Sequence, residues 1–183
     1  MAILTAAVVV VGLLCLADLL LTFGVIRRLR EHTEQLAGFH GSHDDAPITD
    51  LADGATPVSF TAETLDGEQV SGPAGLRMVA FFSATCSACP TRVPPFLEYV
   101  RANQIDRDSI LAVMINPDGD EVSYQEDVAK VARITLASHD GELDKAFKVR
   151  GYPTFFVLDG TGSLSEATHE PATLAPLTAV RQP

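Results

Sequence analysis

Residues 78–96 read MVAFFSATCSACPTRVPPF and place two cysteines between an apolar run and a helical pattern. The run Met78–Phe82 is too short for a helix and is followed by Ser83, which predicts a strand buried on both faces. After the cysteines, apolar residues recur at the spacing of one helix face: Val93, Phe96, Leu97 and Val100. We therefore expect a central strand, then Cys86 at the N-terminus of a helix and Cys89 one turn deeper.

The sequence on both sides of this stretch predicts an α/β fold. Upstream, Val58–Thr64 alternates like a half-buried strand and is followed by an Asp-Gly turn and a short strand at Gln69–Ser71. Downstream, apolar runs and helical patterns predict further elements: strands Ile110–Ile115, Ile134–Ala137 and Thr154–Leu158, and helices Glu121–Arg133 and Glu142–Phe147. The order strand, helix, strand implies a βαβ crossover. We expect a central mixed sheet flanked by helices.

The spacing of Cys86 and Cys89 favours thiol-disulfide exchange. Two residues separate the cysteines, so one sulfur can be exposed while the other reaches it from within the helix. Backbone N–H groups and the helix dipole would stabilise the thiolate of Cys86 and lower its pKa, which makes it the attacking nucleophile. Cys89 would stay protonated until it attacks the mixed disulfide, which makes it the resolving cysteine.

Two motifs carry a resemblance to a known family. FFSATCSACPTRVPPF, residues 81–96, resembles the active-site strand and helix of the thioredoxin-like superfamily, and VRGYPTFFVLDGTG, residues 149–162, resembles its cis-proline strand. Their long separation is similar to that in membrane-anchored TlpA/ResA-like thiol-disulfide oxidoreductases, including methylamine dehydrogenase accessory proteins. The resemblance implies a cis peptide bond at Pro153 opposite the sulfurs, a substrate groove bordered by Tyr152, and a helix kink at Pro94.

The resemblance also implies an activity and partners. Such proteins exchange disulfides with protein substrates through the cysteine pair, without a cofactor or a metal. TlpA-like members often act as reductases that an upstream thiol electron donor supplies. We therefore expect a protein disulfide or dithiol as substrate and a second thiol protein as electron donor.

The chain departs from the family pattern at several positions. Thr85 stands where many relatives have Trp, Ala80 where cytoplasmic thioredoxins keep a buried Asp, and Arg92 where some relatives keep a Glu. The usual proton acceptor for Cys89 is therefore not identifiable. Arg92 is either a solvated residue or a fixed charge that stabilises a thiolate. Few residues follow Gly162, so the last strand and helix of the fold should be short or irregular.

The N-terminal segment predicts a membrane anchor. Ala2–Ile26 is apolar except for Asp18, and as a helix it is long enough to cross a hydrocarbon core of ~30 Å. We expect a single transmembrane helix over residues 1–28, a polar linker over 29–56 and a thioredoxin-like domain over 57–183.

Two arguments disagree on the side of the membrane that holds the domain. Arg27, Arg28 and Arg30 follow the apolar segment and no Lys or Arg precedes it, so the positive-inside rule places the domain in the cytoplasm. Disulfides persist outside the cytoplasm, and the TlpA-like branch works there. We expect an extracytoplasmic domain.

Other functions are weighed against these motifs. The net charge of -11 argues against a nucleic-acid partner. A peroxiredoxin-like thiol peroxidase is an alternative, although Ser83 stands where its motif has Thr and the preceding Pro is missing. A copper carrier would combine the two cysteines with His139 or His169. A thioredoxin-fold module that binds a partner without turnover is a further alternative.

Overall fold

The computed structural model describes residue 12, residues 48–116 and residues 122–177. Apart from residue 12, the predicted transmembrane helix lies outside these residues, as does most of the predicted linker, so both stay predictions. None of the helices within the described ranges is long and apolar enough to cross a membrane. Pro47–Pro183 form one compact unit, which contains both sequence motifs.

Within the described residues, a five-stranded mixed sheet forms the centre of this unit, in the order β5-β4-β3-β6-β7. Strands β3, β4 and β5 are parallel to one another, whereas β6 runs antiparallel to β3 and β7 runs antiparallel to β6. The bounds are Met78–Ser83 for β3, Ile110–Ile115 for β4, Arg133–Ala137 for β5, Thr154–Leu158 for β6 and Leu164–Thr168 for β7. The predicted α/β fold with a central mixed sheet is confirmed.

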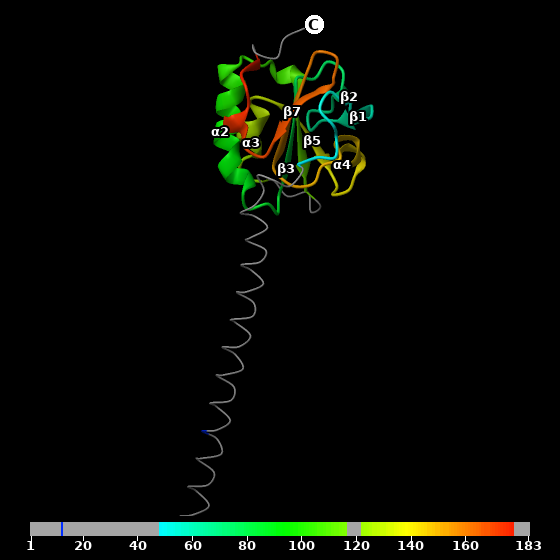
Figure 1. Ribbon diagram of the computed structural model, residues 1–183. Coiled ribbons are helices and arrows are strands. Elements are labelled where there is room, and N and C mark those ends of the chain that lie inside the picture. Colours follow the sequence, from blue (N-terminus) through cyan, green and yellow to red (C-terminus); the bar gives the residue numbers. More distant parts are fainter. Residues whose placement is uncertain (1–11, 13–47, 117–121, 178–183) are drawn as a thin grey trace, which may run out of the picture. The chain divides into compact units, whose positions relative to one another are not determined.

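Helices and a hairpin cover the two faces of the sheet (Figure 1). One face packs against α2 and α3, and the other packs against α4 and the antiparallel pair β1 and β2. The bounds of these covering elements are Cys89–Ala102 for α2, Gln125–Ala129 for α3, Glu142–Phe147 for α4, Phe60–Glu63 for β1 and Gln69–Gly72 for β2.

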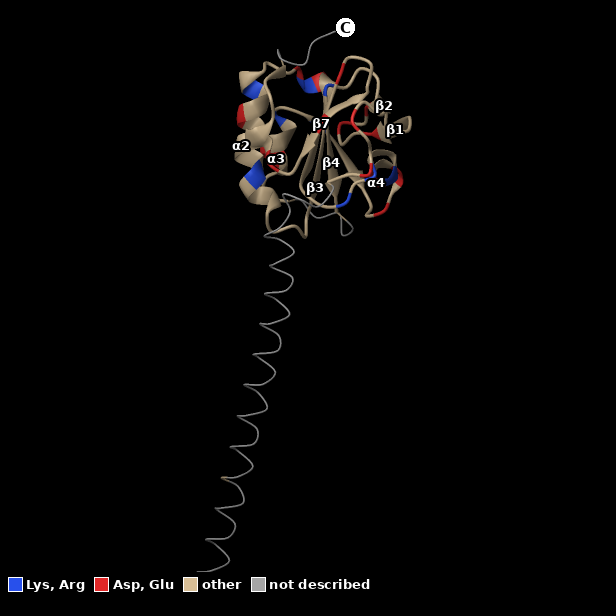
Figure 2. Ribbon diagram, viewed as in Figure 1, with Lys and Arg blue, Asp and Glu red and all other residues tan. Residues whose placement is uncertain are grey.

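Strand β3 shows why its sequence is an uninterrupted apolar run. Met78, Ala80 and Phe82 belong to the core cluster that includes α2. Val79 and Phe81 belong to the cluster that includes α4. All residues of β3 and β4 are buried, and Figure 2 shows both strands without Lys, Arg, Asp or Glu. A strand that is covered on both faces has no solvent side on which polar residues could alternate.

Two regions refine the sequence prediction. Helix α3 is shorter than the predicted helix Glu121–Arg133, and the last residue of that prediction, Arg133, instead pairs with Leu111 and begins β5. The last strand of the sheet is short, as expected: β7 has five residues, and its pairing with β6 shifts register between Val157 and Leu158. The 3-10 turn η2 (Pro171–Thr173) follows it.

Residues 48–55 pack onto the folded unit, although the sequence analysis assigned them to the linker. Thr49 forms a bridge with Val149, and its hydroxyl donates to the Phe147 carbonyl at 2.7 Å. The Gly54 N–H donates to the Leu164 carbonyl at 2.8 Å, and the Leu164 N–H donates to the Ala55 carbonyl at the same distance. Hydrogen bonds to backbone groups do not require a periodic pattern of apolar residues, so the sequence did not predict these contacts.

We expect Gly162→Ala to destabilise the fold more than Gly67→Ala. Both glycines have positive φ, 92° and 79°, so an alanine meets a similar backbone cost of roughly 1 kcal/mol at each. A Cβ at Gly162 would lie 2.8 Å from backbone atoms of Pro73 and Ala74, whereas one at Gly67 has nothing within 4 Å. Urea denaturation should show an additional loss of about 1–3 kcal/mol for Gly162→Ala. Equal losses would contradict the steric argument.

Candidate active site

Cys86 lies in the turn that joins β3 to α2, and Cys89 is the first residue of α2. The Cys86 N–H donates to the Ser83 carbonyl at 3.1 Å, and the Cys89 N–H donates to the Cys86 carbonyl at 3.3 Å. Helix α2 begins at Cys89, and Pro90 occupies its first turn, where a missing N–H costs no helical hydrogen bond. Cys86 therefore precedes the helix, rather than occupying its N-terminus as the sequence analysis expected.

The two sulfurs have different surroundings. Both are present as thiols, and Cys86 is partly exposed whereas Cys89 is fully buried. The pKa of Cys89 is raised well above its ordinary value, first by its hydrogen bond with Cys86 and then by burial. The Ser83 N–H, 3.5 Å from the Cys89 sulfur, acts in the opposite direction, as does the Tyr124 hydroxyl. At neutral pH Cys89 is a thiol that must lose its proton before it can attack.

A loop with a cis proline lies against Cys86. The Tyr152–Pro153 peptide bond is cis, as the resemblance to the thioredoxin-like superfamily implied. The Cys86 thiol donates a hydrogen bond to the Tyr152 carbonyl at 3.2 Å, across 66 positions of sequence. Pro153 is buried and Tyr152 is partly exposed. The structure thus places Tyr152 against the Cys86 sulfur, with Pro153 next to it in the chain.

Asp144, which the sequence analysis did not single out, holds the side chain of Tyr152. The Tyr152 hydroxyl donates to Asp144 Oδ2 at 2.5 Å, and the Asp140 N–H donates to the same oxygen at 2.9 Å. Asp144 is only 6% exposed. Burial and the bond to Asp144 raise the pKa of Tyr152, so its hydroxyl remains a donor. Nothing in the sequence around Asp144 signals this role, because the contact depends on how α4 approaches the loop.

We expect Tyr152→Phe to cost more stability than Tyr99→Phe. Tyr152 donates to a buried carboxylate, and the loss of a hydrogen bond to a charged group costs about 1.5–3 kcal/mol. The Tyr99 hydroxyl donates to the Ala175 carbonyl at 2.9 Å, a neutral hydrogen bond worth about 1 kcal/mol. Urea denaturation at neutral pH measures both losses. A smaller loss for Tyr152→Phe would show that Asp144 does not depend on this hydroxyl.

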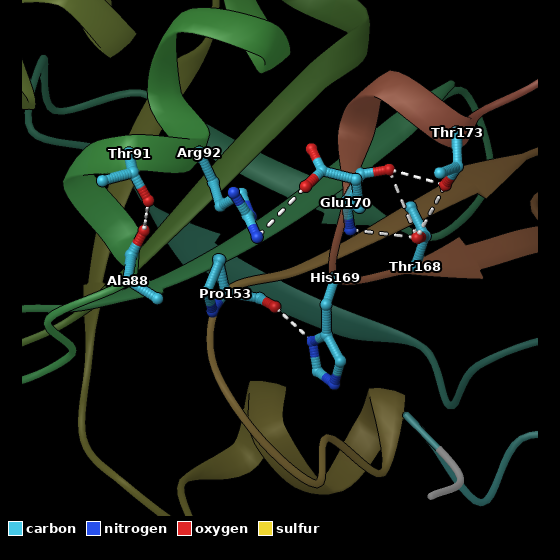
Figure 3. A network of polar contacts seen from close by, with 8 residues as sticks. All are labelled: Ala88, Thr91, Arg92, Pro153, Thr168, His169, Glu170 and Thr173. Carbon is cyan, nitrogen blue, oxygen red and sulfur yellow. Dashed lines mark hydrogen bonds and ion pairs between the residues drawn. The ribbon is translucent and has the colours of Figure 1, made fainter. Parts of the chain in front are cut away.

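A polar network joins α2 to the chain after β7 (Figure 3). Arg92 Nη2 lies 3.1 Å from Glu170 Oε2, and both side chains are partly exposed. Beside this ion pair, Nδ1 of His169 lies 2.5 Å from the Pro153 carbonyl oxygen. Arg92 is thus engaged with a carboxylate, which favours a structural role over the thiolate-stabilising one considered from the sequence.

The other candidate residues from the sequence occupy different environments. Thr85 is exposed, and Ala80 is fully buried in β3. The ring of His139 lies edge-on to Tyr152, with centroids 5.7 Å apart, whereas His169 contacts Pro153. Within the part of the chain that the structure describes, no group of three or more His, Cys, Asp or Glu side chains is placed to hold a metal ion.

Comparisons with known proteins agree with this fold. No protein-family model matches the chain, and no curated protein matches its sequence. A thiol:disulfide interchange protein from Bacteroides sp. has a similar structure, with a TM-score of 0.52 and 22% identity, over 67% of this chain and 84% of that chain. The thioredoxin domain of a thiol-disulfide oxidoreductase from Bacteroides vulgatus is also similar, with a TM-score of 0.50 and 23% identity, over 63% of this chain and 86% of that chain. The chain has the thioredoxin-like fold, with Cys86 between β3 and α2, Cys89 at the start of α2 and a cis proline before β6.

Proposed function

We propose that this chain is a thiol-disulfide oxidoreductase that exchanges disulfides with protein substrates through Cys86 and Cys89. The observation that carries the proposal is the contact of the partly exposed Cys86 sulfur with the Tyr152 carbonyl, beside a buried Cys89 to which Cys86 is hydrogen-bonded. One sulfur is accessible to a partner, and the other is protected but within reach. The fold shared with two bacterial proteins described as acting on disulfides adds support.

The reaction consists of two thiol-disulfide exchanges. The Cys86 thiolate attacks a substrate disulfide, forms a mixed disulfide and releases one substrate thiol. Cys89 then attacks the sulfur of Cys86, which forms the Cys86–Cys89 disulfide and releases the second substrate thiol. The substrate gains two electrons and the cysteine pair loses two. An upstream dithiol must therefore reduce the pair before the next cycle.

The substrate approaches across the loop that contains Tyr152. Its backbone carbonyl contacts Cys86, and its partly exposed side chain is anchored to Asp144. An extended substrate peptide would pair with backbone atoms of this loop, as peptides do when they add to an exposed strand. The bulk of Tyr152 then influences which partners fit.

The proposal also covers the direction of electron transfer and the location of the domain. We assign the chain as a reductase, attached to the membrane through residues 1–28, with its domain on the extracytoplasmic side. The support is the resemblance to TlpA-like proteins and the apolar segment Ala2–Ile26. A redox potential measured against glutathione tests the direction, since ~30 mV changes the two-electron equilibrium by about tenfold. A reporter fused to the C-terminus tests on which side of the membrane the domain lies.

Insulin reduction tests the activity. The full chain, purified in detergent with dithiothreitol as electron donor, should accelerate insulin reduction, and a variant with both Cys86→Ser and Cys89→Ser should not. A chain that leaves insulin unchanged but consumes peroxide would favour the peroxidase alternative.

A further inference from the structure

We infer that Tyr124 is a positioning residue of the resolving step, whose hydroxyl donates a hydrogen bond to the Cys89 sulfur as that sulfur becomes a thiolate. This inference rests on the proposed disulfide exchange and adds to it a residue that neither sequence motif contains. Tyr124 follows Ser83 by 41 positions in the sequence, and β4 lies between the two residues along the chain.

The side chain of Tyr124 reaches the end of β3 beside the buried sulfur. Tyr124 immediately precedes α3 and is 8% exposed. Its ring packs against Phe82, with centroids 5.7 Å apart, and its hydroxyl donates to the Ser83 carbonyl at 3.2 Å. The N–H of the same Ser83 lies 3.5 Å from the Cys89 sulfur. Ser83 thus connects Tyr124 and Cys89, which belong to one core cluster.

The hydroxyl can change its hydrogen-bond acceptor without leaving a buried carbonyl unsatisfied. The Ser83 carbonyl also accepts the Cys86 N–H at 3.1 Å. When the Tyr124 O–H turns toward Cys89, the carbonyl keeps this second bond. A hydroxyl hydrogen rotates to suit its surroundings, so the change needs no movement of the backbone.

The protonation behaviour of both groups is consistent with this role. Burial is the largest cause that raises the pKa of Tyr124, so the phenol keeps its proton and acts as a donor. The same hydroxyl lowers the pKa of Cys89, against the stronger opposing effects of Cys86 and burial. A donor to a buried thiolate has most effect where the sulfur is otherwise poorly solvated. Ala80, which belongs to the same core cluster as Cys89, contributes no polar side chain.

In the resolving step the bonds change as follows. The S–H bond of Cys89 breaks, a bond forms between the Cys89 and Cys86 sulfurs, and the bond between Cys86 and the substrate sulfur breaks. The proton ends on the released substrate thiol. Tyr124 keeps its own proton and stabilises the negative charge that builds up on Cys89.

Stopped-flow reaction with Ellman's reagent separates the two exchanges, because each releases one coloured thionitrobenzoate. All chains carry Cys15→Ser, so that two of the three cysteines remain. Tyr124→Phe should leave the first phase unchanged, slow the second phase by about tenfold or more at neutral pH, and move the pH profile of that phase upward. Tyr99→Phe is the matched control, since it removes a hydroxyl of another buried tyrosine that donates to a backbone carbonyl.

The outcomes distinguish this inference from the proposed function. If the parent chain shows both phases and Tyr124→Phe has the same second-phase rate and pH profile, the inference about Tyr124 is overturned. The proposed disulfide exchange is then still supported. A parent chain without a second phase contradicts the proposed exchange itself. Should Tyr124→Phe not fold, 3-fluorotyrosine placed at Tyr124 supplies a more acidic donor. It should move the pH profile of the second phase downward, and an unmoved profile overturns the inference.

Discussion

Cys86→Ser is expected to abolish disulfide exchange, with kcat/KM for insulin reduction lower by on the order of a thousandfold or more. Cys86 is the partly exposed sulfur of the pair and contacts the Tyr152 carbonyl at 3.2 Å. A serine hydroxyl in its place is not ionised at neutral pH and forms no disulfide with a substrate. Insulin turnover measures the loss, and circular dichroism establishes that the variant is folded.

Cys89→Ser is the matched control for this prediction. If Cys86 is the nucleophile and the buried Cys89 the resolving cysteine, as proposed, this variant should accumulate a mixed disulfide with the substrate. Mass spectrometry under non-reducing conditions should find the substrate attached at Cys86 in this variant and absent from Cys86→Ser. If Cys86→Ser accumulated the mixed disulfide instead, Cys89 would be the nucleophile and Cys86 the resolving cysteine.

The second large effect is expected on stability, from Phe155→Ala. Phe155 is fully buried in β6, and its ring contacts Phe82 and Phe96, each with centroids 5.5 Å apart. Truncation of a buried phenylalanine costs about 3–5 kcal/mol, because apolar burial is lost and a cavity remains. A domain is typically stable by only about 5–15 kcal/mol, so the variant should lose a large part of its stability. Urea denaturation measures the shift in the unfolding midpoint.

Leu136→Ala provides the comparison for Phe155→Ala. Leu136 also lies in the central sheet, in β5, but it is 43% exposed. Its truncation should change the free energy of unfolding by no more than about 1 kcal/mol. A loss as large as that of Phe155→Ala would mean that strand position, rather than burial, determines the cost.

Much of the sheet could be predicted from local sequence, because buried strands are visible as apolar runs. The run at Met78–Phe82 identified the central strand β3, and Thr154–Leu158 coincides with β6. Arg133 was wrongly assigned to the predicted helix Glu121–Arg133, because its pairing with Leu111 in the sheet depends on a neighbouring strand. The packing of residues 48–55 on the domain was missed for the same reason.

The candidate site was only partly visible in the sequence. The C-x-x-C spacing pointed to Cys86 and Cys89, and the resemblance to thioredoxin-like proteins pointed to Tyr152 and Pro153. Tyr124 and Asp144 had no such signal. A buried tyrosine and a single aspartate are common in any domain, and only their contacts with Ser83 and Tyr152 give them a part in the site.

The sequence by itself determined features that depend on near neighbours along the chain: the buried strands, the close spacing of the two cysteines and the proline before β6. The tertiary structure alone decided which distant groups meet the sulfurs, since the Tyr152 carbonyl reaches Cys86 across 66 positions and the Tyr124 hydroxyl reaches Ser83 across 41. Apolar periodicity records which face of an element is buried, but hydrogen bonds between elements depend on strand order and helix placement, which no local pattern encodes.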